Sequence, residues 1–316
     1  MKENDYTVLK PFVDWSFKFL FGREESKELL MGLINMVAEP ESKIVDLTYL
    51  NPEVIPESEG IKGCIFDVLC KDENGNEFVV EMQNSPYTNM RDRLVYYASR
   101  LIDRQGLRKK EWEYDVHKVM AICIMNYPLP GFEDVMSDVK LIVEGTGKVF
   151  SDKMRFIILQ APRLKVEKLD KSQKFYENLL ILMRNMQSGQ YTMEDLRGKI
   201  LLEEWEQALE DYWLKLVEMS KTMTPDQQDE YDESLKIYRD SRCFLSYAKN
   251  EGREEGRAEG LAEGRAEGRA EGRAEGRAEG RTEEKLAIAK SMKSLGIQPD
   301  IISKATELTI QQIEEL

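Results

Sequence analysis

The sequence predicts an α/β fold: a mixed central sheet flanked by helices, then a helical region, a repeat of Glu-Gly-Arg-Ala and a small helical tail. Apolar residues make up 41% of the 316 residues, which is enough for a substantial core. The first half of the chain shows segments in the order helix, helix, strand, hairpin, helix, strand. This order describes an α/β core whose sheet is mixed.

Two amphipathic helices open the chain. We expect the first to begin at Asp14, a residue type that favours the N-cap position, and to end at Gly22 after an aromatic run. The second is expected over residues 26–37, where leucine, isoleucine and valine recur at helical spacing.

A hairpin is the strongest local signal that follows. Its strands are expected over 65–70 and 77–83, joined by a turn at 72–76 that contains Asn74-Gly75. The other expected elements are a strand near 44–50, a helix over 90–110, a buried strand over 116–125, a strand over 156–160, and a helical stretch over 172–249 broken at Pro225.

Composition narrows the chemistry. A net charge of −14 with 33% charged residues argues against a membrane protein and against a strongly basic binder, although a local basic stripe is enough to contact phosphates. The N-terminus lacks the apolar stretch of a signal peptide, so we expect a cytoplasmic protein. A single histidine, His117, and four scattered cysteines offer no zinc cluster and no Ser-His-Asp arrangement. Hydrolytic chemistry would therefore depend on carboxylates, and with them on a metal.

The register of the hairpin decides whether two acidic side chains meet. A two-residue turn at Asn74-Gly75 would set Asp67 opposite Met82 and put the carboxylates of Asp67 and Glu81 on opposite faces. A three-residue loop over 73–75 would set Asp67 opposite Glu81, with Gly75 in a left-handed position.

Only the second register separates carboxylates from hydrophobic side chains. It places Phe66 and Val68 on the face of Val80 and Met82, and it leaves the acids together on the other face. Because strand side chains alternate, Glu81 shares its face with Gln83. The sequence therefore favours a carboxylate pair on one face of the hairpin.

Both acids lie inside apolar runs, and a buried acid needs a partner or a metal. Magnesium prefers oxygen ligands, and two carboxylates with a backbone carbonyl are sufficient to hold it. The alternative is a solvated sheet face that carries ordinary charges.

Asp67, thirteen intervening residues and then Glu81-Met82-Gln83 resemble the D…(D/E)-X-Q variant of the PD-(D/E)XK nuclease signature. Residues 14–22, Asp-Trp-Ser-Phe-Lys-Phe-Leu-Phe-Gly, resemble the opening of the recombination-promoting nuclease and transposase family. Residues 50–53, residues 65–69, and Arg93 with Tyr96-Tyr97 also fit that family. The resemblance covers residues 5–130 in detail and the helical remainder loosely.

The resemblance implies a restriction-endonuclease-like core and a DNA endonuclease, dependent on magnesium or manganese, that is linked to recombination or mobile elements. By resemblance, Asp67 and Glu81 would be metal ligands and the Met82 carbonyl a third. Gln83 would belong to the catalytic set, but it stands where many relatives have lysine, and a neutral amide only orients groups by hydrogen bonds.

A cation would then have to come from elsewhere, and Lys18 and Arg93 are the candidates. Asp14 would approach the metal from the first helix, unless it serves only as an N-cap. The main rival hypothesis is a weak or inactive nuclease fold that acts as a DNA- or partner-binding module. A third is an assembly protein in which the C-terminal regions dominate.

The helix over 90–110 is locally basic. Arg93, Tyr97, Arg100 and Arg104 fall along one stripe, at spacings that repeat on a single helix face. We expect this stripe to contact DNA phosphates, the alternative being a solvated helix face.

Three regions are expected: a nuclease-like domain over 1–250 with a helical C-terminal part, a repeat spacer over 251–281, and a tail over 282–316 that resembles a helix-turn-helix unit. Because the repeat has a period of four, we expect its Glu and Arg residues to pair along a helix. The repeat is either a solvated spacer or a helix that joins copies of itself through its Gly/Ala stripe, which leaves a homo-oligomer open. The tail is acidic at its end, so packing and DNA binding are equally open to it.

Overall fold

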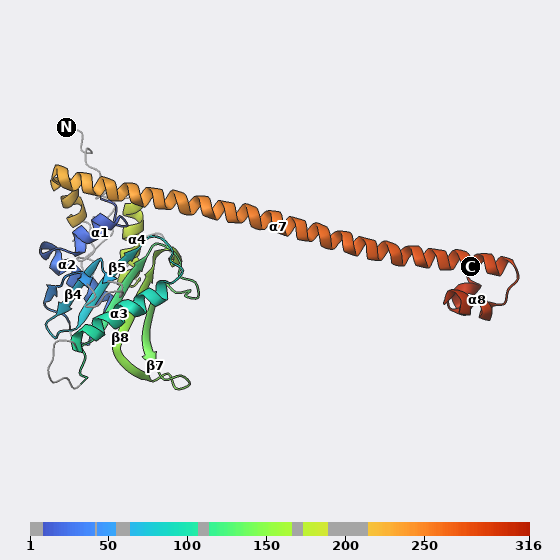
Figure 1. Ribbon diagram of the computed structural model, residues 1–316, viewed down its shortest axis with the longest axis horizontal. Coiled ribbons are helices and arrows are strands. Elements are labelled where there is room, and N and C mark those ends of the chain that lie inside the picture. Colours follow the sequence, from blue (N-terminus) through green and yellow to red (C-terminus); the bar gives the residue numbers. More distant parts are fainter. Residues whose placement is uncertain (1–8, 42, 55–63, 107–113, 166–172, 189–213) are drawn as a thin grey trace, which may run out of the picture. The chain divides into compact units, whose positions relative to one another are not determined.

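The computed structural model describes residues 9–41, 43–54, 64–106, 114–165, 173–188 and 214–316 (Figure 1). The chain divides into two compact units, Met1–Cys243 and Phe244–Leu316. Among the described residues, no helix combines the length and the apolar character needed to cross a membrane.

A six-stranded mixed sheet forms the centre of the N-terminal unit, in the order β1-β4-β5-β6-β8-β7. Its strands are β1 (Leu47–Tyr49), β4 (Val68–Asp72), β5 (Glu77–Gln83), β6 (Val119–Met125), β7 (Met136–Ile142) and β8 (Val149–Gln160). Strands β5, β6 and β8 are parallel, and antiparallel neighbours flank them on both sides. A separate small sheet pairs β2 (Glu53–Val54) with β3 (Cys64–Ile65). The expected α/β core with a mixed sheet is confirmed.

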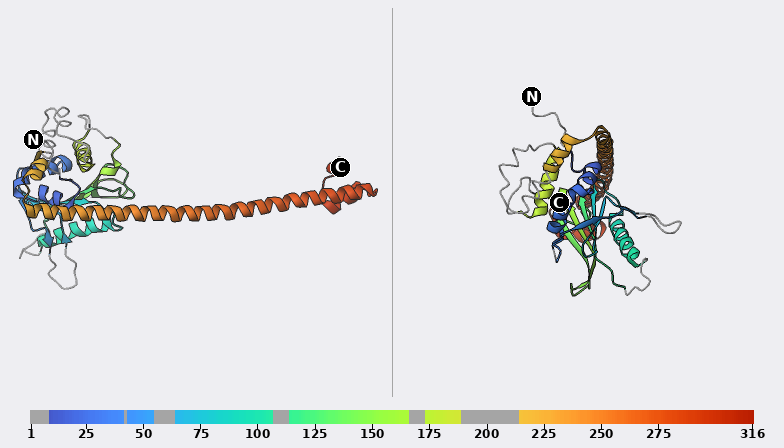
Figure 2. Two further views of the ribbon diagram at one scale, coloured as in Figure 1. Left: turned by 90° about the horizontal axis from the view of Figure 1, so that it is seen from above. Right: turned by 90° about the vertical axis from the view of Figure 1, so that its left-hand side faces the viewer.

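Helices cover both faces of the large sheet (Figures 1 and 2). One face packs against α1 (Asp14–Phe21), α2 (Lys27–Ala38) and α4 (Phe175–Ser188), and the other packs against α3 (Met90–Gly106). Two single-turn helices, η1 (Glu24–Ser26) and η2 (Ala161–Arg163), complete the connections. Side chains of β5 alternate between the two cores, with Val80 and Met82 on the α1 side and Val79 on the α3 side.

The β4–β5 hairpin adopts the register with the three-residue loop. Val68 faces Val80, so the next position out is Asp67 opposite Glu81. At the other end the Asp72 amide donates to the Asn76 carbonyl over 2.9 Å, and Gly75 has φ 82°. The ring of His117 lies 3.0 Å from where a Cβ at Gly75 would stand, so space and backbone conformation both require glycine there. The register prediction is confirmed.

One detail of the hairpin prediction is wrong. The expected strand over 65–70 is interrupted at Phe66 and Asp67, between β3 and β4. Across this break the alternation of side chains shifts, so that Phe66 packs in the α3-side core, edge-on to Tyr97 with ring centroids 4.9 Å apart. Phe66 therefore does not share the face of Val80, whereas Val68 does.

The N-cap assigned to Asp14 is also wrong. Helix α1 begins at Asp14 itself, and Val13 occupies the cap position without a side-chain hydrogen bond. The acidic group therefore lies inside the first turn, where the helix dipole stabilises negative charge.

Several other boundaries differ from expectation. The strands near 44–50 and 116–125 are shorter, and the strand over 156–160 is the end of the longer β8. Strand β7 was not expected. Residues 107–110 of the expected helix and 189–213 of the expected helical stretch lie outside the described residues.

The helix α7 (Pro225–Ser294) begins at the proline that was expected to break the pattern. It runs through the whole repeat, so both expected domain boundaries, after 250 and after 281, fall within it. The expected Glu–Arg pairing is wrong: none of the ion pairs in the described part of the chain joins two residues of 251–281. A period of four sets Glu four residues from Glu and Arg four residues from Arg, which places like charges side by side.

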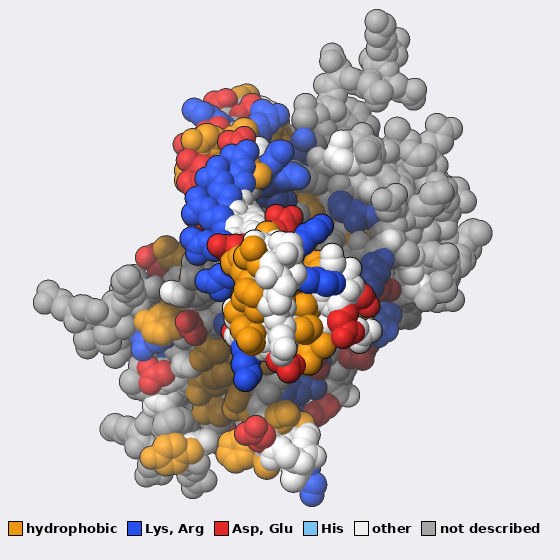
Figure 3. All heavy atoms as spheres, turned by 90° about the vertical axis from the view of Figure 1, so that its right-hand side faces the viewer, with side chains coloured by type: hydrophobic (Ala, Val, Ile, Leu, Met, Phe, Trp, Pro, Cys, Tyr) orange, Lys and Arg blue, Asp and Glu red, His pale blue; other side chains and the backbone are white. Residues whose placement is uncertain are grey.

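The tail folds back on the end of α7 through α8 (Pro299–Thr306) and α9 (Ile310–Glu314). Its small core is formed by Ala289, Ile302, Leu308 and Ile313. Figure 3 faces this C-terminal unit and shows hydrophobic side chains at its surface among charged ones, consistent with the exposure of Leu295, Ile301 and Ile310.

Candidate active site

The two predicted acids lie where the β4–β5 ladder ends. The Asp67 amide donates to Glu81 Oε1 over 3.2 Å, and the Met82 amide donates to Asp67 Oδ2 over 2.9 Å. Each carboxylate thus accepts a backbone donor of the facing strand and continues the ladder with side-chain oxygens. This exchange fixes both carboxylates at one end of the sheet, against each other.

Both carboxyl groups are largely shielded from water. The side chain of Glu81 is 1% exposed and that of Asp67 is 14% exposed. Burial, followed by the nearby charge of Asp67, raises the pKa of Glu81 to about 8. Burial also raises the pKa of Asp67, against the hydrogen bond from Met82 and the charge of Lys18. A positive charge placed beside the pair would therefore stabilise the ionised form of both carboxylates.

The two candidate cations reach this pair from helices on opposite faces of the sheet. Lys18 on α1 places Nζ 3.5 Å from Asp67 Oδ1, and Arg93 on α3 places Nη2 3.8 Å from Glu81 Oε2. Ion pairing with Asp14 and Asp67 raises the pKa of Lys18, although its burial acts in the opposite direction. Neither contact with the two acids is as short as a charge-assisted hydrogen bond, which is about 2.7–2.9 Å.

Asp14 does not contact the acidic pair directly and is linked to it through Lys18. Its Oδ2 lies 2.9 Å from Lys18 Nζ, one helical turn along α1. Lys18 therefore bridges Asp14 and Asp67, and Asp14 orients the ammonium group.

Gln83 is buried beside Glu81. Its Nε2 donates to Glu81 Oε2 over 3.0 Å, and its backbone carbonyl accepts from the Asn126 amide of the loop after β6 over 2.8 Å. The side-chain amide therefore holds the Glu81 carboxylate in place, as a neutral group is able to do.

The predicted basic stripe is mostly engaged within the chain. Arg93 Nε donates to the Tyr97 hydroxyl over 3.0 Å, which fixes the guanidinium near Glu81. Arg100 pairs with Asp103 over 2.9 Å, and Arg104 pairs with Glu77 over 2.7 Å at the opposite end of β5. The stripe thus extends along β5, and Arg93 is its member at the acidic pair.

Sequence reasoning missed the polar residues that hold this end of the sheet. Asn84 Nδ2 donates to the Phe12 carbonyl over 2.6 Å, and Asn126 Nδ2 donates to Asn84 Oδ1 over 3.2 Å. The guanidinium of Arg93 lies 5.4 Å from the centroid of the Tyr87 ring. Asn84 directly follows Gln83, which was the one available signal; the others become neighbours only through the fold.

The donor set fits a hard divalent cation. Two carboxylates converge at the site, and the Met82 carbonyl points to the same side as its amide, toward Asp67. Oxygen ligands of this kind suit magnesium or manganese. Among the described residues, no three of His, Cys, Asp or Glu gather into a larger metal-binding group, so the side-chain donors at this end are Asp67 and Glu81.

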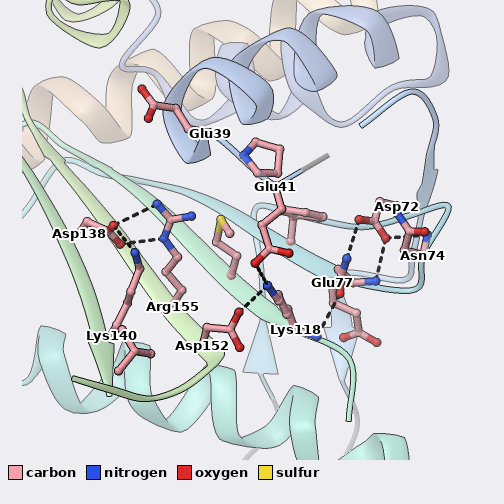
Figure 4. Close-up of a pocket in the computed structure, with 15 residues that line it drawn as sticks. Glu39, Glu41, Asp72, Asn74, Glu77, Lys118, Asp138, Lys140, Asp152 and Arg155 are labelled. Atoms are coloured by element: carbon pink, nitrogen blue, oxygen red, sulfur yellow. Dashed lines mark hydrogen bonds and ion pairs between the residues drawn. The ribbon is translucent and has the colours of Figure 1, made fainter. Parts of the chain in front are cut away.

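The described residues of the N-terminal unit also form at least two cavities. The larger, about 770 Å³, opens at the other ends of the strands, and several of its charges are paired, as Lys118 is with Glu41 and Asp152 (Figure 4). The smaller, about 450 Å³, adjoins the site through Lys18 and is also lined by Arg23 and by Trp15. Only the smaller one continues the surface of the candidate site.

A family model described as PD-(D/E)XK nuclease family transposase matches residues 11–248. The matched region contains every candidate site residue. Comparison with curated proteins gives no match, and neither does comparison with solved structures.

Proposed function

The chain belongs to the PD-(D/E)XK nuclease family transposases, and on this basis we propose that it hydrolyses DNA phosphodiester bonds with a divalent metal ion held by Asp67 and Glu81. The family itself makes the chain a nuclease-like protein linked to mobile elements. One observation carries the finer proposal: the buried carboxylate of Glu81 faces the partly buried carboxylate of Asp67 at the end of the β4–β5 ladder, and no cation among the described residues is in direct hydrogen-bond contact with Glu81.

In this proposal Asp67 and Glu81 share one task, and Gln83 has another. Asp67 and Glu81 would hold magnesium or manganese together with the Met82 carbonyl. A bound ion of this kind offsets charge on the scissile phosphate and lowers the pKa of a water molecule at neutral pH. Gln83 keeps the Glu81 carboxylate oriented through its hydrogen bond of 3.0 Å.

Lys18 and Arg93 replace the charge that Gln83 lacks. Both carry their positive charge within 4 Å of a ligand carboxylate, close enough to meet the non-bridging oxygens of a phosphate bound to the metal. Because they come from α1 and α3, they would hold the phosphate from two sides. The hollow beside Lys18, which includes Arg23, would receive the DNA strand next to it.

The test is nicking of supercoiled plasmid by the purified full chain, with magnesium and with EDTA. We expect cleavage only with the metal, and loss of cleavage in Asp67→Asn and in Glu81→Gln. Asp152→Asn is the matched control, because it removes a carboxylate at the opposite end of the sheet.

Equal cleavage by Asp67→Asn and the natural protein would refute the assignment. Salt-dependent DNA binding without any cleavage under magnesium or manganese would instead favour the binding-module hypothesis, which the neutral Gln83 keeps in view.

A further inference from the structure

Strand β7 ends the large sheet, and among the described residues no strand pairs with its outer side. The Gln160 amide donates to the Val135 carbonyl over 2.7 Å, which identifies position 135 as hydrogen-bonded toward β8. Because these positions alternate along an antiparallel strand, residues 137 and 139 also bond toward β8, opposite Ile158 and Phe156. The backbone amides and carbonyls of Met136, Asp138 and Lys140 therefore face away from the sheet.

This outer edge is complementary to itself. Two antiparallel copies of β7 could pair about a two-fold axis that passes through Val139, which is then the crossing point of the register. This register would set Asp138 of each copy opposite Lys140 of the other. All four of these residues present outward backbone groups, so this register also satisfies the ladder. Shifting the crossing point to Asp138 would set the two Asp138 side chains against each other, and like charges directly opposite are destabilising.

The end of the β7–β8 hairpin adds apolar surface beside the edge. The side chains of Leu141, Ile142, Val143, Val149 and Phe150 are 44–76% exposed. With the crossing at Val139, Ile142 would lie opposite Met136 of the second copy, and Val143 opposite Val135. Pairing would thus cover part of an apolar patch that the single chain leaves open to water.

The charged side chains of β7 are not placed to prevent another strand from pairing with its edge. Lysine on an edge strand often blocks pairing when it is directed outward. Here Lys140 Nζ lies 2.9 Å from Asp138 Oδ2, and Arg155 binds the same carboxylate over 2.7 Å, over the cavity on the α1 side of the sheet (Figure 4). Among the described residues, no strand covers the backbone edge itself.

We propose that β7 is a homodimer interface, through which two copies of this chain join their sheets antiparallel about a two-fold axis at Val139. The occupant of the edge is a second copy, because Asp138 and Lys140 lie opposite each other when the strand pairs with itself at Val139.

Charge exchange tests the pairing. Asp138→Lys gives a strand with two lysines and Lys140→Asp gives one with two aspartates, so that each variant repels its own copy. We expect light scattering on the natural chain to give twice the mass of one chain, and each variant alone to give the mass of one. Mixing the two variants restores opposite charges at both positions, so the mixture should return to the double mass. Circular dichroism of each variant checks that the fold is kept.

Cross-linking gives a second readout that is specific to this edge. In the proposed ladder the two copies of Val139 form a non-hydrogen-bonded pair with Cα atoms about 4.5 Å apart, which a disulfide spans. In a Cys243→Ser background, which removes the exposed native thiol, Val139→Cys should form a covalent dimer when diamide oxidises the two thiols. Ser137→Cys is the matched control, because it lies on the same face but opposite Leu141 of the second copy.

Covalent dimers from Val139→Cys and not from Ser137→Cys support the proposal. A natural chain of single mass, a double mass that survives both charge variants, or equal cross-linking at 137 and 139 would overturn it.

Discussion

Replacing Glu81 by glutamine should reduce the loss of stability that the metal-free N-terminal unit suffers as the pH rises from 5.5 to 8. Burial and the charge of Asp67 raise the pKa of Glu81 from 4.5 to about 8. A carboxyl group whose pKa is raised by folding keeps its proton longer in the folded state than in the unfolded one. Its contribution to stability is therefore complete below pH 4.5 and is lost as the pH rises through about 8.

The size of the effect follows from the same shift. One pKa unit corresponds to ~1.36 kcal/mol, so the rise from pH 5.5 to 8 would cost the natural protein up to about 3 kcal/mol through this group. The raised pKa of Asp67 acts with the same sign in both proteins. Glu81→Gln keeps the shape and loses the titration, so its stability should fall less over this range.

Urea unfolding followed by tryptophan fluorescence measures this difference. All four tryptophans lie within Met1–Cys243, so the signal reports the unit that contains the site. The titrations are run in EDTA at pH 5.5, 7 and 8. Unfolding free energies that fall in parallel for the natural protein and for Glu81→Gln would refute the reasoning, since Glu81 would then titrate alike in the folded and unfolded states.

Binding of magnesium should raise the stability of the natural protein, and the gain should depend on pH. At pH 8, magnesium at about 100 times its dissociation constant should stabilise the natural protein by ~2.7 kcal/mol. The gain should shrink at pH 5.5, where the proton competes with the metal for Glu81. In Glu81→Gln it should be small at both pH values.

Three further predictions concern positive charge along β5. Gln83→Lys adds a cation next to Glu81 Oε2, where Arg93 already lies 3.8 Å away, so plasmid nicking should be no faster than in the natural protein. A tenfold faster rate, equivalent to ~1.36 kcal/mol, would show that Arg93 does not fill the role of the missing lysine. Arg104→Ala should lower the free energy of unfolding by about 1–3 kcal/mol, because it leaves the partly buried Glu77 carboxylate without its partner at 2.7 Å. Arg100→Ala should change stability by less than about 0.5 kcal/mol and lower the salt slope of DNA binding by about one, and the reverse order of stability effects would contradict this ranking.

The acidic pair was predictable from sequence because it depends on local information. A three-residue loop with glycine in the left-handed position and the alternation of hydrophobic residues are both read within seventeen residues, from Asp67 to Gln83. Lys18 and Arg93 were nominated as cations from the same opening and helix motifs, and the structure places both beside the pair.

Other features depend on contacts between distant segments, which no local pattern records. The partner of Arg104 is Glu77, 27 residues away, so the engagement of the basic stripe was not visible in the stripe itself. Strand β7 escaped prediction because it contains Asp138 and Lys140 and lies at an edge, where one side of the strand is not buried. Phe66 changed face because the chain bends at Asp67, the residue whose side chain takes over the hydrogen bonding of the ladder.

The four-residue period of the repeat within α7 does not match the turn of the helix. Four residues of α-helix turn through about 400°, so each repeat advances every residue type by about 40° around the helix axis. The eight glycines from Gly252 to Gly280 therefore wind through most of a revolution, and no straight seam of small residues exists along which two such helices could lie. Averaged along its length, the helical repeat therefore exposes nearly the same mixture of side chains on every side. Gaining or losing one repeat changes the length of the helix by about 6 Å and leaves the composition of its surface as it was.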